Sequence, residues 1–216
     1  MQFKSVTSLD EAANIAAQAG LSGLEFLKGM PGSIGGAVYM NARAYGQEIS
    51  DVLFETDLID FSKEKAGEPA NVLKLQANKN EFSYKKSPFQ GCDLFILNAS
   101  FQLTKEDPQK IQAKMENCLN DRQDKGHYRF PSAGSVFKND PGFGKPAGKI
   151  IDELGLKGMT IGGAQVAAFH GNIIINKSGA KSIDIFNLVN EVAAKVKNKT
   201  GFSLEPEILF IGDFTN

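Results

Sequence analysis

The sequence predicts an α+β fold, because short helical and strand patterns alternate along the chain without internal repeats or low-complexity tracts. Of the 216 residues, 42% are hydrophobic and 23% are charged, which suits one large or two small globular domains. The 24 basic and 25 acidic residues nearly cancel, so the chain lacks the basic excess that binding to a phosphate backbone requires. Nucleic acid is therefore not an expected partner.

The first half of the chain predicts one helix, an irregular segment and a sheet. Ser8 and Glu11 match a capping box ahead of an alanine-rich helix that Gly20 ends. Residues 23–46 are so rich in glycine that we expect a structured loop there, and neither a regular helix nor a plain strand. β-Branched and aromatic residues predict strands at 52–61 and 93–103, with loop and a short strand between them.

The second half predicts more helix. Asp107 and Pro108 supply the N-cap and the first position of a helix that runs to about Gly126. We expect a domain boundary just before it, which divides the chain into residues 1–104 and 105–216. Beyond it, the patterns predict a short helix at 148–154, a buried strand at 172–176, a helix at 182–199 and a final strand at 206–212.

The cysteines and the hydropathy pattern indicate in which cellular compartment the protein is expected. Cys92 and Cys118 lack histidine or cysteine neighbours at metal-ligand spacing, so they predict no metal site and no disulfide framework, and we expect two buried thiols. The sequence contains no signal-peptide pattern and no run of about 20 apolar residues that could span a bilayer. We therefore expect a soluble cytoplasmic protein with no membrane segment.

The glycine-rich segment from Met30 to Gly46 is the strongest local signal. Gly32, Gly35 and Gly36 would let main-chain N–H groups approach an anionic group such as a pyrophosphate. A tight turn packed against a sheet is the alternative. The spacing differs from G-x-G-x-x-G, so a classical dinucleotide-binding fold is not indicated.

Four other places carry side chains suited to chemistry. The Ser135 hydroxyl could donate a proton, with a structural serine as the alternative. One carboxyl of Glu205 and Glu207 could act as an acid in a cleft, or both could be surface charges. His170 could be functional or a buried histidine with its hydrogen bonds satisfied, and residues 84–86 could meet an anion or form a solvated loop.

Five motifs, at residues 23–46, 81–89, 131–139, 149–176 and 200–212, occur in an order and spacing that resemble the UDP-N-acetylenolpyruvoylglucosamine reductases of bacterial cell-wall synthesis. The resemblance implies a partial FAD-binding lobe of the two-lobe flavin oxidoreductase type, followed by a C-terminal α+β substrate-binding domain. It implies FAD and NADPH as cofactors. The implied substrate is a UDP-sugar, the enolpyruvyl ether of UDP-N-acetylglucosamine, which this family reduces to UDP-N-acetylmuramate.

The resemblance also implies roles for individual residues. Ser135 matches the family's proton donor, Glu207 matches its catalytic glutamate, and Lys85 stands where the family has a catalytic arginine. The positions that match substrate contacts are Tyr84, Lys125, Asn139 and His170. The positions that match the segment along the flavin are Pro31, Gly32, Ser33, Ile34, Gly35, Gly36, Asn41, Ala42 and Tyr45.

Three departures from the family pattern qualify the resemblance. Lys85 keeps the charge of the arginine but cannot hold a carboxylate through two parallel hydrogen bonds, so we expect slower turnover. Arg43 replaces a common glycine and should restrict the access of its loop to positive φ. The family's N-terminal flavin-binding lobe is not matched, so we expect weak FAD binding or a complementing lobe on another chain. The alternative is a non-catalytic fragment or pseudoenzyme that binds a nucleotide sugar or a protein partner.

Overall fold

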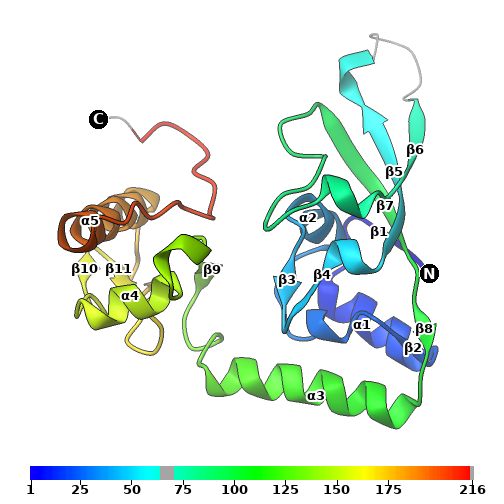
Figure 1. Ribbon diagram of the computed structural model, residues 1–216, viewed down its shortest axis with the longest axis horizontal. Helices are drawn as coiled ribbons and strands as arrows, with labels where there is room; N and C mark the ends of the chain where they lie inside the picture. The colour runs from blue at the N-terminus through cyan, green and yellow to red at the C-terminus, as the bar shows by residue number, and fades with distance from the viewer. Residues whose placement is uncertain (64–70, 215–216) are drawn as a thin grey trace. The chain divides into compact units, whose positions relative to one another are not determined.

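The computed structural model describes residues 1–63 and 71–214, which form two compact units. The first unit is Met1–Asp121 and the second is Arg122–Asn216. Each unit combines helices with an antiparallel sheet (Figure 1). The predicted α+β class is confirmed.

The first unit is built on a four-stranded sheet in the order β1-β7-β5-β6. All three neighbouring pairs are antiparallel, and the central pair aligns Thr56 of β5 with Ala99 of β7. The strands predicted at 52–61 and 93–103 are confirmed as β5 and β7, and β6 is the short strand expected between them. The bounds are β1 (Gln2–Lys4), β5 (Leu53–Asp60), β6 (Val72–Gln76) and β7 (Leu94–Phe101).

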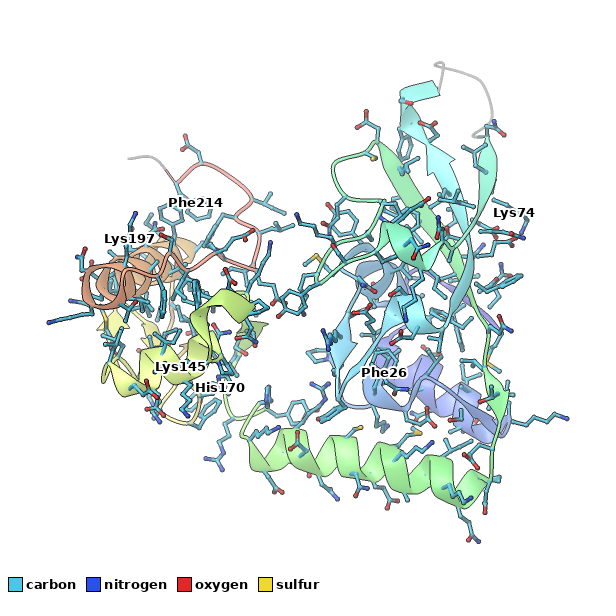
Figure 2. All side chains as sticks on the ribbon, viewed as in Figure 1. Phe26, Lys74, Lys145, His170, Lys197 and Phe214 are labelled. Atoms are coloured by element: carbon cyan, nitrogen blue, oxygen red, sulfur yellow. The ribbon has the colours of Figure 1, made fainter. Side chains whose placement is uncertain are left out.

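Two helices complete the core of the first unit. In α1 (Leu9–Gln18), the Ser8 hydroxyl accepts a hydrogen bond from the Glu11 N–H at 3.1 Å, as the capping pattern predicts. α2 (Ile34–Tyr39) packs on β1 and β7. Apolar residues of both helices join the sheet in one buried core that also contains Phe26 (Figure 2).

The prediction that residues 23–46 contain no helix is wrong, because α2 lies within them. Its packing depends on Gly35, whose N–H donates to the Ser5 carbonyl at 2.8 Å. A Cβ at Gly35 would lie 2.8 Å from the Cβ of Ser5 and 3.3 Å from its carbonyl oxygen. Glycine therefore lets the helix pack directly on the main chain that follows β1.

Short elements connect these parts of the first unit. The two-stranded sheets are β2 with β8 and β3 with β4. Their bounds are β2 (Leu21–Ser22), β3 (Arg43–Ala44), β4 (Gln47–Glu48) and β8 (Thr104–Lys105). Single 3₁₀ turns lie at Glu25–Leu27, Ile49–Asp51, Phe61–Lys63 and Lys79–Glu81.

The predicted helix at 108–126 is confirmed as α3 (Pro108–Asp124), and the Asp107 carboxylate accepts the Gln109 N–H at 2.9 Å. Ile111 and Met115 of α3 are buried in the core of the first unit, so this unit extends to Asp121, past the boundary expected at residue 104. The division into a cofactor lobe and a substrate domain stays a prediction. Cys118 of α3 is buried but Cys92 is exposed, so the expectation of two buried thiols is wrong for Cys92.

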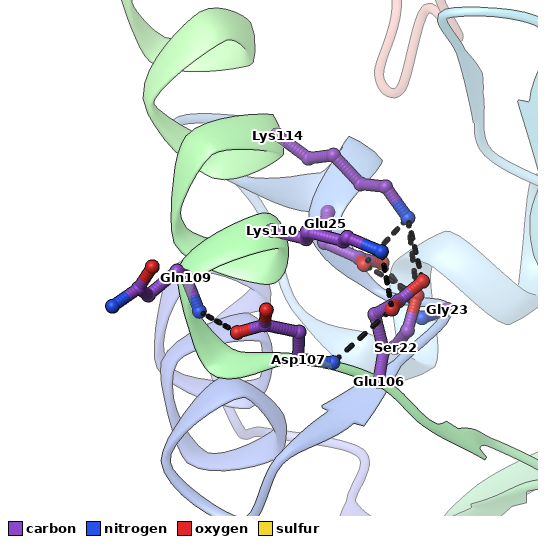
Figure 3. Close-up of polar contacts among 8 residues, drawn as sticks. All are labelled: Ser22, Gly23, Glu25, Glu106, Asp107, Gln109, Lys110 and Lys114. Carbon is purple, nitrogen blue, oxygen red and sulfur yellow. Dashed lines mark hydrogen bonds and ion pairs between the residues drawn. The ribbon is translucent and has the colours of Figure 1, made fainter.

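A buried carboxylate, that of Glu25, joins α3 to β2 (Figure 3). It is 5% exposed and accepts hydrogen bonds from the Ser22 hydroxyl and the Gly23 N–H, both at 2.6 Å. The Nζ of Lys114 in α3 lies 3.7 Å from the same carboxylate. Burial acts to raise the pKa of Glu25, but these hydrogen bonds and the Lys114 charge outweigh it, so the pKa is lower than its ordinary value of 4.5.

The second unit is built on a sheet in the order β10-β11-β12-β9, with α4 and α5 contributing the other part of its core. The predicted helices at 148–154 and 182–199 and the predicted strand at 172–176 are confirmed. The bounds are β9 (Ser132–Ser135), α4 (Ala147–Glu153), β10 (Thr160–Ile161), β11 (Ala164–Val166), β12 (Ile173–Asn176) and α5 (Ser182–Thr200), with a 3₁₀ turn at Pro141–Phe143.

The final strand predicted at 206–212 is wrong. Pro206 forms an isolated bridge with Phe137, and no strand follows it within the described residues. Instead, Phe210 and Phe214 contact Phe186 of α5, with ring centroids 5.1 and 4.9 Å from its ring (Figure 2 labels Phe214). Aromatic packing on the helix thus replaces pairing along a sheet edge.

We expect Glu25→Gln to lower the free energy of unfolding of the first unit by about 1–3 kcal/mol, because a buried charged acceptor loses its charge-assisted hydrogen bonds. The folded-state pKa is lowered, so the contribution of Glu25 should be complete above its ordinary pKa of 4.5 and lost as the pH falls further. The free energy of unfolding of the wild type and of the variant is measured by urea unfolding between pH 3 and pH 7, with amide NMR signals of the first unit as the readout. This range of about 4 pH units covers the protonation of the carboxylate.

The matched control is Lys114→Ala, which removes the other member of the pair. Lys114 is half exposed, so its loss should cost only about 0–1 kcal/mol. Equal losses for the two variants, or a Glu25→Gln effect that does not shrink toward acid pH, would contradict the assignment of the stabilisation to the buried carboxylate.

Candidate functional site

The hydroxyl and carboxylate predicted to be catalytic lie on neighbouring segments of the second unit. Ser135 is the last residue of β9 and pairs with Ile173 of β12. The carbonyl of the next residue, Val136, accepts the Glu207 N–H at 2.7 Å. Ser135 is exposed and Glu207 is half-buried. The structure therefore places two residues that are far apart in the sequence on adjacent segments, which main-chain hydrogen bonds join.

His170 lies in the turn that precedes β12 and is half-buried (Figure 2). Its Nδ1 accepts the main-chain N–H of Asn172 at 3.1 Å, which puts the proton of the neutral ring on Nε2. Burial lowers the pKa of His170 below its ordinary value of 6.5, and the charges of Lys125 and Lys157 act in the same direction. At neutral pH the ring is thus an uncharged N–H donor through Nε2.

The other two predicted substrate contacts of the second unit differ in what surrounds them. Asn139 is exposed, but its side-chain oxygen accepts the Ala147 N–H at 2.9 Å and so caps the start of α4. Lys125 is exposed, follows the end of α3 and acts electrostatically on His170. Asn139 therefore has a structural role whether or not it also contacts a ligand.

In the first unit, Tyr84 and Lys85 occupy the tip of a two-residue turn. Ser83 and Lys86 exchange main-chain hydrogen bonds of 3.1 and 3.0 Å across it. Lys85 has a φ of 59°, in the left-handed region that non-glycine residues seldom adopt. The Nε2 of Gln90 donates to the Lys85 carbonyl at 3.1 Å and to the Tyr39 carbonyl at 2.8 Å, which ties this turn to the end of α2.

Asn41 holds the same turn from the other side. Its Nδ2 donates to the Ser83 carbonyl at 3.1 Å, and its Oδ1 accepts the Ser50 N–H at 3.0 Å. Its side chain is fully buried. Asn41 thus shapes the glycine-rich segment with hydrogen bonds inside the protein. Its predicted part in flavin binding would be to hold the main chain of this segment in place.

The N–H groups of the expected anion nest are partly used within the protein. Gly35 donates to Ser5, Gly36 donates to the Ser33 hydroxyl at 3.3 Å, and the buried Ile34 donates to the Thr7 carbonyl at 2.9 Å. For Gly32 and Ser33, by contrast, the described part of the chain offers no partner for the main-chain N–H. Pro31, Gly32 and Gly36 are exposed, so the open part of this segment is its beginning.

The remaining positions of the segment lie at the β3–β4 hairpin. The Tyr45 hydroxyl lies 2.9 Å from the Asp121 carboxylate and 3.0 Å from the Cys118 carbonyl of α3, and Tyr45 has a φ of 53°. The Ala42 N–H donates to the Ala37 carbonyl at 2.8 Å. Arg43 lies in the extended strand β3, and the positive φ angles of this part of the chain are at Asn41 and Tyr45, so the effect of Arg43 on the loop stays a prediction.

Two amide side chains that the sequence analysis missed hold these segments in place. Gln90 ties the Lys85 turn to α2, as described above. Asn172 is 3% exposed, and its side chain hydrogen-bonds both the N–H and the carbonyl of Phe137. A polar residue at the start of an apolar run was the available signal for Asn172, whereas nothing local singles out Gln90.

Residues 1–63 and 71–214 contain neither a membrane-spanning helix nor a metal-binding cluster. Over these ranges, the helices are all too short or too polar to cross a membrane. The same ranges hold no cluster of three or more histidine, cysteine, aspartate or glutamate residues that could bind a metal ion.

These features define a two-unit α+β protein in which the second unit presents a hydroxyl, a carboxyl and a neutral imidazole on adjoining segments. A family model described as UDP-N-acetylenolpyruvoylglucosamine reductase, C-terminal domain, matches residues 126–211. The crystal structure of a UDP-N-acetylenolpyruvylglucosamine reductase from Thermus caldophilus superposes with a TM-score of 0.78 at 31% identity, covering 96% of this chain and 71% of that chain.

Curated relatives give the same result. The UDP-N-acetylenolpyruvoylglucosamine reductase of Borrelia garinii subsp. bavariensis is 45% identical over 205 residues, which cover 95% of this chain and 65% of the relative. That of Pseudothermotoga lettingae is 40% identical, covering 95% of this chain and 69% of the relative. The chain belongs to the UDP-N-acetylenolpyruvoylglucosamine reductase family, and it spans 65% of the length of the first of these relatives.

We expect the NMR titration midpoint of His170 to lie below 6.5, with the neutral Nε2–H form present at pH 7. Because the folded-state pKa is lowered, the unfolded chain binds this proton first. The free energy of unfolding of the second unit should therefore fall as the pH decreases from 6.5 through the folded-state pKa. His170→Asn, whose amide oxygen can still accept the Asn172 N–H, should flatten this part of the profile. A midpoint above 6.5, or an identical profile for the variant, would refute the assignment.

Proposed function

We propose that this protein acts in the FAD- and NADPH-dependent reduction of the enolpyruvyl ether of UDP-N-acetylglucosamine to UDP-N-acetylmuramate, in peptidoglycan synthesis. Membership of the reductase family supports the substrate and the cofactors. The observation that carries the proposal is the position of Ser135 and Glu207 on adjoining segments, on either side of Val136. A proton donor and a second acid are what such a reduction requires of the protein.

The residues of the second unit would bind the substrate and move its proton. Bound FAD would supply hydride to one carbon of the enolpyruvyl double bond, and the other carbon then needs a proton. Ser135, exposed at the end of β9, would deliver that proton from its hydroxyl. Glu207 would assist as a hydrogen-bonding acid beside the developing enol. The Nε2–H of the neutral His170 would donate to a substrate oxygen.

The residues of the first unit fit a phosphate group of FAD. The main-chain N–H groups of Gly32 and Ser33 lack partners among the described residues, and the exposed glycines beside them leave room for an anion to approach. We propose that Pro31–Gly36, Ala42 and Tyr45 lie along the cofactor, with Asn41 setting the shape of the segment.

Tyr84 and Lys85 would serve an anionic group of the substrate or the cofactor. The lysine ammonium ion is a point charge without the planar fork of arginine, so it supplies attraction with less orientation. Gln90 anchors the turn through the Lys85 carbonyl, so the main chain that carries this side chain is held at a φ of 59°.

The domain roles and the location follow from the same proposal. Residues 1–104 would belong to the cofactor lobe and 105–216 to the substrate domain, with Lys125 and Asn139 among the substrate contacts. The UDP-sugar substrate and NADPH support a cytoplasmic location. If the protein binds a UDP-sugar without oxidising NADPH, the non-catalytic alternative replaces this proposal.

We expect Ser135→Ala to lower the rate of NADPH oxidation by about 10²–10⁴-fold, because a positioned proton donor is removed. The assay supplies FAD, NADPH and the enolpyruvyl ether and measures absorbance at the nicotinamide band. Ser132→Ala changes an exposed serine at the other end of β9 and should leave the rate within about twofold. Unchanged turnover in the Ser135 variant would remove the proposed role.

Replacing Lys85 with arginine should raise turnover by about 10-fold or more, because arginine can hold a carboxylate through two parallel hydrogen bonds. Lys86→Arg is the matched control, since Lys86 is the next residue and is exposed, and we expect no gain from it. Both variants are compared by kcat and KM in the same assay. A gain from Lys86→Arg alone would transfer the proposed role to that residue.

A further inference from the structure

Asn172 uses its side chain and its main chain to connect three parts of the second unit. Its Oδ1 accepts the Phe137 N–H at 2.8 Å, and its Nδ2 donates to the Phe137 carbonyl at 2.7 Å. Its main-chain carbonyl accepts the Val136 N–H at 2.8 Å, and its main-chain N–H donates to the Nδ1 of His170. Asn172 and Phe137 are both almost fully buried. We call these contacts the Asn172 clamp.

The clamp lies where the pairing of the sheet is irregular. β12 pairs with β9 at Ile173 with Ser135 and at Ile175 with Ser132, and the register shifts between these two pairs. A shift of one residue would turn the side chains of a strand to the opposite face. The two hydrogen bonds to Phe137 stabilise the observed register at the Ser135 end, because a slip of the strand would break both of them.

The clamp also reaches the carboxylate segment and the imidazole. Val136, whose N–H bonds to Asn172, accepts the Glu207 N–H through its own carbonyl. The turn that carries His170 is short, so fixing residue 172 fixes the N–H that bonds to the ring. Ser135, Glu207 and His170 are thus each one hydrogen bond or one residue away from atoms that the clamp holds.

We propose that Asn172 is a positioning residue for the proposed reaction, which sets the alignment of the Ser135 strand and keeps His170 in the Nε2–H tautomer. It acts through its hydrogen bonds to Phe137 and His170. Both the Oδ1 and the Nδ2 of its side chain are needed, because one accepts from the N–H of Phe137 and the other donates to the carbonyl of Phe137. The role of Ser135 in this inference rests on the proposed function, whereas the tautomer of His170 does not.

The charged groups that face His170 would not produce the same tautomer preference on their own. Lys125 and Lys157 lower its pKa but act on the charged form of the ring, and they do not select between the two neutral forms. The His127 ring also lies near, with its centroid 6.3 Å from that of His170. The hydrogen bond from Asn172 is the contact that distinguishes Nδ1 from Nε2.

The test is NMR of protein labelled with ¹⁵N in its histidines, comparing the wild type with Asn172→Asp and Asn172→Ala. The aspartate keeps an acceptor for the Phe137 N–H but places an oxygen against the Phe137 carbonyl, and the alanine removes both bonds. We expect the wild-type His170 to show an unprotonated Nδ1 and a protonated Nε2 at pH 7. Both variants should show a mixture of the two neutral tautomers.

The matched control is Asn176→Ala, at the other end of β12, where the side-chain oxygen accepts the Ala180 N–H. This variant should lose stability but keep the wild-type tautomer. A wild-type ring protonated on Nδ1, or folded Asn172 variants with the unchanged tautomer, would overturn the proposal. If both variants unfold, the wild-type tautomer and slow hydrogen exchange of the Phe137 and Val136 N–H groups still decide it.

Turnover separates this inference from the proposed function. In the NADPH assay, Asn172→Asp should lower kcat by about 10-fold or more with a smaller change in KM, since positioning is lost and binding groups remain. If the wild-type protein shows the expected tautomer but no reductase activity, the role of the Asn172 clamp in the His170 tautomer is supported and the proposed function is contradicted. An active Asn172→Asp variant with wild-type kcat would remove the positioning role.

Discussion

Hydrogen bonding of buried side-chain amides to distant main chain is the interaction on which the irregular parts of both units depend. A main-chain N–H or carbonyl that is buried without a partner is costly, and segments outside helices and sheets cannot satisfy each other by pairing. Asn41 meets this need between the Ser83 turn and Ser50, and Asn172 meets it at Phe137. Each therefore holds loops in single conformations without regular secondary structure, which is the state that a binding surface requires.

The regular elements were predictable because their signals are local. The Ser8 cap, Asp107 with Pro108, and Gly201 each lie within one turn of the helix end that they define, and the structure confirms all three. The two wrong predictions of secondary structure arose where a distant contact decides the outcome. α2 forms despite its glycines because Gly35 packs on Ser5, and the chain after Pro206 leaves the sheet because Phe210 and Phe214 pack on Phe186.

The same distinction explains what could be foreseen of the candidate site. The residue types suited to acid and anion chemistry could be found by inspection, and the resemblance to a family added their expected roles. The contacts that orient these residues could not be found in this way, because Asn172 and Phe137 are 35 residues apart and Asn41 and Ser83 are 42 residues apart. Asn139 shows the converse difficulty, because a side chain that looks available in the sequence already caps a helix.

The contrast between the two cysteines has a practical use. Cys118 is buried in α3, whereas Cys92 is exposed in the loop that follows the Lys85 turn and Gln90. A maleimide dye should therefore react at one position only, without mutagenesis, and would report from beside a loop that Gln90 and Ser87 anchor to α2. A change in the emission of such a label would therefore report ligand binding near the glycine-rich segment.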